Sequence, residues 1–125
     1  MGQKTKRVLI ADDNAHLRKA LCRLFEGHAY LEICAEAANG REAVEKAIAI
    51  RPDLIILDLS MPVMNGLEAA RHLSALMPHV PKILFTLHAH ALIKSDLDAA
   101  GISRVVSKSD MVELIGHSED LVKAA

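Results

Sequence analysis

The sequence predicts an α/β fold, with a doubly wound parallel sheet of five strands and five helices. Short apolar runs alternate five times with segments of helical periodicity along the 125 residues. Residues 8–11 and 54–57 are apolar at every position, which is typical of central strands buried on both faces of a parallel sheet. A chain of this length normally forms one domain. We therefore expect a single domain over residues 5–124.

The first two strand–helix pairs occupy residues 7–52. A strand over residues 7–11 precedes a helix that Gly27 ends, and residues 31–37 alternate between apolar and polar, which predicts a strand with one polar face. Asn39, with Glu42 three residues later, forms a capping-box pattern at the start of the second helix, and Pro52 ends that helix. The apolar positions of the first helix, the alternating strand and the second helix are Leu17, Ala20, Leu21, Leu24 and Phe25; Leu31, Ile33, Ala35 and Ala37; and Ala43, Val44, Ala47 and Ile48.

Three more pairs follow. After the strand at 54–57, Asn65 caps a helix that ends before Pro78, and a fourth strand covers residues 82–86. The pattern of the next helix, about residues 90–100, is the least regular, because Ser95 and Asp96 interrupt it before Gly101 ends it. A short strand at 104–107 and a last helix complete the chain. The apolar positions of these three helices are Leu67, Ala70, Leu73 and Met77; Leu92, Ile93, Leu97 and Ala100; and Met111, Leu114, Ile115, Leu121 and Val122.

The chemistry of the strands also predicts their order. The two most apolar strands, at 7–11 and 54–57, belong in the middle as neighbours, whereas the alternating strand at 31–37 suits one edge. The short strand that begins with Arg104 suits the other edge. These placements give the order 2-1-3-4-5 of a flavodoxin-like sheet, a class for which the order and the position of the ligand crevice are known from flavodoxin and CheY.

Composition excludes several classes of function. A formal net charge of −1 argues against direct nucleic-acid binding, which needs a basic surface. The basic opening, residues 2–7, precedes an apolar run too short for a signal peptide, and no stretch approaches the ~20 apolar residues of a membrane span. Cys22 and Cys34 lack metal-ligand spacing, so we expect reduced, buried side chains. These features indicate a cytoplasmic domain.

Charged and polar residues follow the ends of the strands. Asp12 and Asp13 close the first strand, Asp58 the third, Thr86 the fourth, and Lys108 follows the fifth. In an open parallel sheet the ligand crevice lies beyond the carboxyl ends of the strands, so these side chains are expected to meet there. Three carboxylates alone would repel one another, so a divalent cation is the expected fourth member of the site.

These residues resemble the motif set of a receiver domain of two-component response regulators, over essentially the whole chain. The matching segments are residues 8–13 (VLIADD) and 58–66 (DLSMPVMNG), with Thr86 and Lys108 each following its strand. Residues 65–71 (NGLEAAR) and 108–110 (KSD) are most similar to the NarL/LuxR-type group. Asp12, taken alone, is also a common helix cap or turn former, and Lys108 a common surface lysine. The match of all the segments in register makes a purely structural role improbable.

The resemblance implies a role for each residue. Asp58 would be the phosphoacceptor, taking a phosphoryl group from a phosphohistidine of a sensor histidine kinase or a phosphotransfer protein. Mg²⁺ would bind Asp13 and Asp58 directly and Asp12 through a water molecule. The backbone carbonyl of Ser60 would be a further ligand of the ion. Thr86 and Lys108 would bind the phosphoryl oxygens. The domain would then catalyse only its own phosphorylation and dephosphorylation.

The resemblance also marks the positions where receivers vary. Ser60 and His88, each two residues beyond a site residue, are expected to tune dephosphorylation. His88 and His90 invite a metal site of their own, but no further His or Cys supports one and a surface loop is favoured. Val105 occupies the switch position, where receivers usually carry an aromatic ring. Ser109 stands where many have proline, so the Lys108–Ser109 bond is expected to be trans.

Two other functions compete with a phosphorylation-controlled switch. A phosphatase of the haloacid-dehalogenase type also uses an Asp nucleophile and Mg²⁺, but it needs a second Asp where this chain has Ser60. A degenerate receiver acting as a constitutive protein-binding module is the alternative that Val105 favours and the intact Asp58 opposes. For a switch, the output face is expected on the 90–100 helix, the fifth strand and the last helix. The same face would form any homodimer.

Overall fold

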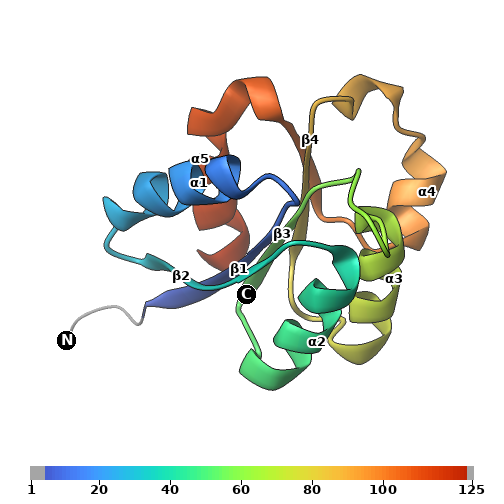
Figure 1. Ribbon diagram of the computed structural model, residues 1–125, viewed down its shortest axis with the longest axis horizontal. Coiled ribbons are helices and arrows are strands. Elements are labelled where there is room, and N and C mark those ends of the chain that lie inside the picture. The colour runs from blue at the N-terminus through green and yellow to red at the C-terminus, as the bar shows by residue number, and fades with distance from the viewer. Residues whose placement is uncertain (1–4, 124–125) are drawn as a thin grey trace.

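The computed structural model describes residues 5–123, which form a five-stranded parallel sheet between two layers of helices (Figure 1). The strand order is β2-β1-β3-β4-β5, as the strand chemistry predicts. Residues 2–4 of the basic opening and Ala124, the end of the predicted domain, lie outside the described residues. The elements are β1 Lys6–Ala11, α1 Ala15–Glu26, β2 Leu31–Ala37, α2 Gly40–Ile50, β3 Leu54–Leu57, α3 Gly66–Leu76, β4 Lys82–Thr86, α4 Lys94–Ala99, β5 Arg104–Ser107 and α5 Met111–Lys123.

Two apolar cores lie on opposite faces of the sheet. Helices α1 and α5 cover one face and α2, α3 and α4 cover the other (Figure 1). The core under α1 and α5 contains both buried aromatic rings, Phe25 and Phe85, while the core on the other face is aliphatic. Strand β3 is buried at all four positions because each face of the sheet is covered along its length.

Strand β2 differs from the prediction of one polar face. Leu31 and Ile33 pack into the core beneath α1 and α5, whereas Ala35 and Ala37 pack into the core beneath α2 and α3. The reason is a β-bulge: Val8 pairs with Ile33 and Leu9 pairs with Ala35, which leaves Cys34 as an extra residue. An extra residue reverses which face the following side chains point to, so the alternation continues in sequence but changes sides in space.

The predicted caps are present at helices α2 and α3. The side chain of Asn39 accepts from the backbone N–H of Glu42 at 2.8 Å, and that of Asn65 accepts from Glu68 at 2.9 Å. The carboxylate of Glu42 accepts a hydrogen bond from the backbone N–H of Ala38 at 3.2 Å. In a capping box the donor would be the N–H of the cap residue itself, which is Asn39, so the observed donor lies one residue earlier. These bonds satisfy backbone donors that a helix leaves free at its start.

The predicted helix over 90–100 is wrong in its extent. A 3₁₀ turn covers Ala89–Ala91, and helix α4 is only the six residues Lys94–Ala99. Ile93 occupies the N-cap position without a side-chain hydrogen bond, because it has no acceptor to offer to the first turn. Gly101 follows the helix at φ +73°, a left-handed conformation that suits glycine and does not continue a right-handed helix.

The cysteines and backbone agree only in part with expectation. Cys22 and Cys34 are both free, but both are half-buried rather than buried. Every peptide bond in the described part of the chain is trans, including Lys108–Ser109. Within residues 5–123 no helix has the length and apolar character needed to cross a membrane.

Candidate functional site

Three carboxylates meet at the carboxyl ends of β1 and β3. Oxygen atoms of Asp12, Asp13 and Asp58 all lie within 4.8 Å of one another. The backbone N–H of Asp58 donates to the carbonyl of Ala11 at 2.9 Å, which extends the pairing of the two central strands as far as the acids. Asp12 and Asp58 are 2 % and 6 % exposed, whereas Asp13 is exposed. The pocket therefore has a buried floor of two acids and an outer acid open to solvent.

Lys108 reaches into this pocket from the end of β5. Its Nζ lies 2.8 Å from Oδ2 of Asp12 and 3.2 Å from Oδ1 of Asp58. Ser107 supports the backbone around the lysine, because its Oγ accepts from the N–H of Ser109 at 3.2 Å and pairs with the Ser109 hydroxyl at 2.7 Å. The residues on either side of Lys108 thus close a short turn that directs its ammonium group at the two buried acids.

Burial and charge act together on the ionisation of the pocket. Burial, followed by the neighbouring charge of Asp12, raises the pKa of Asp58 above its ordinary value of 3.8, and Lys108 offsets only part of that rise. Burial alone would lower the pKa of Lys108, but its bonds to Asp12 and Asp58 outweigh burial and raise it. The lysine is therefore charged near neutral pH.

The donor set fits a hard divalent cation. Oδ2 of Asp12 is fully buried and, although Lys108 is at ion-pair distance, it accepts no hydrogen bond of good geometry from the described residues. The potential ligands of the cluster are all carboxylate oxygens, with no sulfur or imidazole among them, which is the chemistry that Mg²⁺ prefers. Among residues 5–123, this acidic cluster is the one group of three potential ligands, and His88 and His90 belong to none.

The remaining predicted residues lie on β4 and β5 or in the loops after β3 and β4. Thr86 ends β4 and is 2 % exposed, and its Oγ1 accepts from the backbone N–H of His88 at 3.3 Å. Ser60 and His88 are exposed, in the loops after β3 and β4 respectively. Val105 is half-buried on β5, opposite Leu84 in register. Of the predicted site residues, Asp12 and Asp58 are in direct contact with Lys108.

Sequence reasoning missed a close backbone approach at Gly66. A Cβ atom on Gly66 would lie 2.1 Å from the backbone carbonyl oxygen of Asp58, so only glycine fits at this start of α3. The N–H of Gly66 also donates to the carbonyl of Leu59 at 2.9 Å. The Asn65–Gly66 pair therefore caps the helix and holds the loop that carries Asp58, a second purpose that the capping pattern alone does not reveal.

An acidic pocket with a threonine and a lysine, at the carboxyl edge of a 2-1-3-4-5 parallel sheet, defines a CheY-like domain. The family model of the response regulator receiver domain matches residues 8–118. The chain belongs to this family of two-component signalling domains.

Relatives support the assignment and show that receivers occur in longer proteins. A protein-glutamate methylesterase/protein-glutamine glutaminase of Vibrio parahaemolyticus is 41% identical over 93 residues, which cover 74% of this chain and 25% of that protein. Its counterpart from Nocardioides sp. is 36% identical over 121 residues, covering 95% of this chain and 33% of that protein. The chain thus spans between a quarter and a third of these relatives.

Solved structures agree in fold. The response regulator domain of Thermotoga maritima CheB superposes with a TM-score of 0.86 at 25% identity, covering 96% of this chain and 98% of that one. A LuxR-family response regulator from Aurantimonas sp. gives a TM-score of 0.87 at 31% identity over 97% of this chain and 87% of that one. Thermotoga maritima TrrA, in complex with Mg²⁺-BeF, gives a TM-score of 0.83 at 33% identity over 94% of this chain and 99% of that one. Because CheB and LuxR regulators both match, the NarL/LuxR subgroup stays a prediction.

Proposed function

We propose that this domain is a phosphoacceptor: Asp58 takes a phosphoryl group from a phosphohistidine of a sensor histidine kinase or phosphotransfer protein. One Asp58 carboxylate oxygen forms the new O–P bond while the N–P bond to the donor imidazole breaks and the nitrogen keeps its electron pair. The observation that supports this most strongly is the buried Asp58 carboxylate, 3.2 Å from Lys108 and within reach of two further acids. The proposed domain is residues 5–124.

The surrounding residues have separate tasks in this proposal. Lys108 binds a phosphoryl oxygen after leaving Asp58, and the Thr86 hydroxyl donates to another. Asp13 and Asp58 would hold Mg²⁺ directly, with Asp12 acting through a water molecule and Ser60 contributing its backbone carbonyl. When bound, the ion neutralises the charge on the transferred phosphoryl oxygens. Support for the ion comes from the three carboxylates, whose oxygens lie within 4.8 Å of one another, and from the Mg²⁺-BeF complex of the related TrrA.

The output is proposed to be a protein contact on the face made by residues 90–100, β5 and α5. Helix α4 has six residues and lacks a cap, so its local stability should be low, which suits an element that moves. Ile93 and Val112 are 62 % and 79 % exposed on these segments and offer apolar surface to a partner or a second copy. Without an aromatic ring at Val105, we expect a modest shift of population.

The remaining parts of the proposal concern tuning and setting. Ser60 and His88 are exposed in the loops after β3 and β4, and their side chains are proposed to meet water that approaches a phosphoryl group and so to set the lifetime of the phosphorylated state. The domain is proposed to act in the cytoplasm without binding nucleic acid itself, in keeping with a net charge of −1. A constitutive binding module remains the alternative, and half-buried Val105 is the observation that favours it.

The deciding experiment is phosphorylation by acetyl phosphate with and without Mg²⁺, followed by intact-mass measurement. We expect a mass increase of one phosphoryl group in Mg²⁺, none in EDTA, and none for Asp58→Asn. Equal phosphorylation in EDTA, or a wild-type rate for Asp58→Asn, would overturn the assignment. Hydrogen exchange with beryllofluoride tests the output: the largest change in protection is expected within residues 87–108, and a change confined to α1 or α2 would relocate the face.

A further inference from the structure

Arg18 connects helix α1 to the first acid of the pocket. Its Nη1 donates to the backbone carbonyl oxygen of Asp12 at 2.5 Å, and its Nε donates to Oε1 of Glu36 at 3.1 Å. The Arg18 and Glu36 side chains are 18 % and 42 % exposed, so this ion pair is better shielded than the other Arg–Glu pair of the described chain, Arg41–Glu45, whose side chains are 70 % and 65 % exposed. Shielded bonds of this kind hold their geometry better than surface pairs do.

The carbonyl that Arg18 holds belongs to the peptide unit between Asp12 and Asp13. Because a peptide unit is planar, fixing the Asp12 oxygen also fixes the direction in which the chain leaves for Asp13. The preceding N–H of Asp12 donates to Ala37 at 3.0 Å, so both sides of this residue are restrained. Asp13 itself is exposed and has no hydrogen bond or ion pair from its side chain to the described residues, so its carboxylate depends on the backbone for its position.

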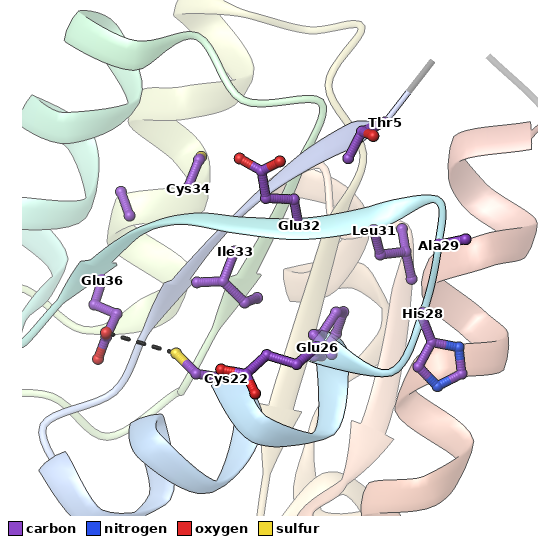
Figure 2. A pocket seen from close by; sticks show the side chains of 12 residues that line it. Thr5, Cys22, Glu26, His28, Ala29, Leu31, Glu32, Ile33, Cys34 and Glu36 are labelled. Atoms are coloured by element: carbon purple, nitrogen blue, oxygen red, sulfur yellow. Dashed lines mark hydrogen bonds between the residues drawn. The ribbon is translucent and has the colours of Figure 1, made fainter. Parts of the chain in front are cut away.

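Glu36 is itself held in place. The Cys22 thiol donates to its Oε2 at 3.6 Å, the contact drawn in Figure 2, and Lys46 donates to its backbone carbonyl. Burial and then the charge of Glu36 raise the pKa of Cys22 to about 11, so the thiol remains a donor. Glu36 and Cys22 line a groove of about 440 Å³ between α1 and the edge strand β2. The support for Arg18 thus reaches from the pocket to the edge of the sheet.

We propose that Arg18 is a positioning residue for the metal-binding acids and that Glu36 orients it. A guanidinium group is required, because two of its nitrogens donate in one plane to two acceptors, one at the residue after β1 and the other on β2. A lysine has a single nitrogen on a flexible stem. The inference rests on the proposed function, since the acids must bind Mg²⁺ for their position to matter. Residues that orient metal ligands from outside commonly change affinity by about tenfold or more when removed.

The test is a Mg²⁺ titration by calorimetry, without any phosphodonor, so the readout does not depend on phosphorylation. We expect Arg18→Ala to weaken Mg²⁺ binding about tenfold, and Arg18→Lys to restore little of it. Arg41→Ala, which removes an exposed Arg–Glu pair on α2, is the matched control and should bind as the wild type does. Circular dichroism establishes that each variant is folded before titration.

The second residue of the pair provides an independent arm. Glu36→Ala should weaken Mg²⁺ binding in the same direction, and the Arg18→Ala/Glu36→Ala double variant should be little worse than Arg18→Ala alone, because both act through one contact. Asp13→Ala separates the two levels of the argument. If Asp13→Ala loses Mg²⁺ binding while folded Arg18 and Glu36 variants bind within about twofold of wild type, this inference is wrong and the proposed function stands. Wild-type affinity in Asp13→Ala would overturn both.

Discussion

Replacement of Asp58 by asparagine tests the electrostatics of the pocket, because it keeps the shape and removes the charge. At an effective dielectric constant of about 20, repulsion by an acid at the 4.8 Å limit that encloses the cluster is about 3.5 kcal/mol, and attraction to Lys108 at 3.2 Å is about 5 kcal/mol. Asp13 adds a further repulsion that is reduced by its exposure to water. The charge terms nearly cancel, so the burial of the Asp58 carboxylate decides the sign.

Burial raises the pKa of Asp58, so its ionised form is less favourable in the folded than in the unfolded protein. We therefore expect Asp58→Asn to be more stable than wild type in EDTA near neutral pH, by about 1–2 kcal/mol, or about 3–6 °C in Tm. The folded wild type binds more protons than the unfolded chain between pH 3.8 and the raised pKa. Its stability rises as pH falls through that window, and the advantage of the variant should disappear.

Thermal unfolding followed by circular dichroism, in EDTA at several pH values, measures this difference. Asp98→Asn is the matched control, because Asp98 is exposed and pairs only with exposed Lys94, so its Tm should match that of wild type. If Asp58→Asn proved less stable than wild type near neutral pH, Lys108 would outweigh burial and the account of the pocket would be wrong. Added Mg²⁺ should stabilise wild type more than Asp58→Asn, which lacks one carboxylate ligand.

Three further predictions concern the support of the pocket. Gly66→Ala should lower the free energy of unfolding by about 2–4 kcal/mol in denaturant unfolding, because its Cβ meets the Asp58 carbonyl. Gly116→Ala, with open space around it on α5, is the control and should raise the free energy of unfolding by about 0.5–1 kcal/mol. Equal effects of the two substitutions would refute the close approach at Gly66. Asn65→Ala should cost about 1 kcal/mol by loss of its cap, and an unchanged unfolding midpoint would show the cap to be unimportant. Lys108→Met should tighten Mg²⁺ binding several-fold in calorimetry, because its ammonium competes with the ion for two carboxylates; weaker binding would contradict that competition.

The sequence predicted the strand order and the meeting of the acids because both follow from local properties. Whether a strand is apolar on both faces depends on its own residues, and that property placed β1 and β3 at the centre. Once those strands are neighbours and parallel, their carboxyl ends coincide, so Asp12 and Asp58 must be close. The same reasoning placed Lys108 beyond the end of β5, where its turn points it into the pocket.

Features that depend on a partner segment escaped prediction. The bulge at Cys34 is a mismatch between β1 and β2, and neither strand carries it alone. Lys82 is the first residue of β4, as predicted, but its burial was not predicted. It is 1 % exposed, and its Nζ donates to the carbonyl of Val80 at 2.7 Å. Burial lowers the pKa of this lysine. Only the folded structure shows that the Val80 carbonyl can accept a hydrogen bond from the buried Lys82 ammonium group.

The prediction of a helix over residues 90–100 is wrong for a different reason, and that reason bears on signalling. The helical pattern of this region is weak. In the structure the region forms a 3₁₀ turn and a helix of six residues that has no capping side chain. An element with so few local bonds takes its conformation from its neighbours, chiefly the loop after Thr86, where the hydroxyl already holds the N–H of His88 at 3.3 Å. If a phosphoryl group at Asp58 draws that hydroxyl away, this bond is lost and the loop has less reason to keep its arrangement. We therefore expect the segment that the sequence predicts worst to respond to phosphorylation, because a weak local preference for one conformation leaves two conformations close in free energy.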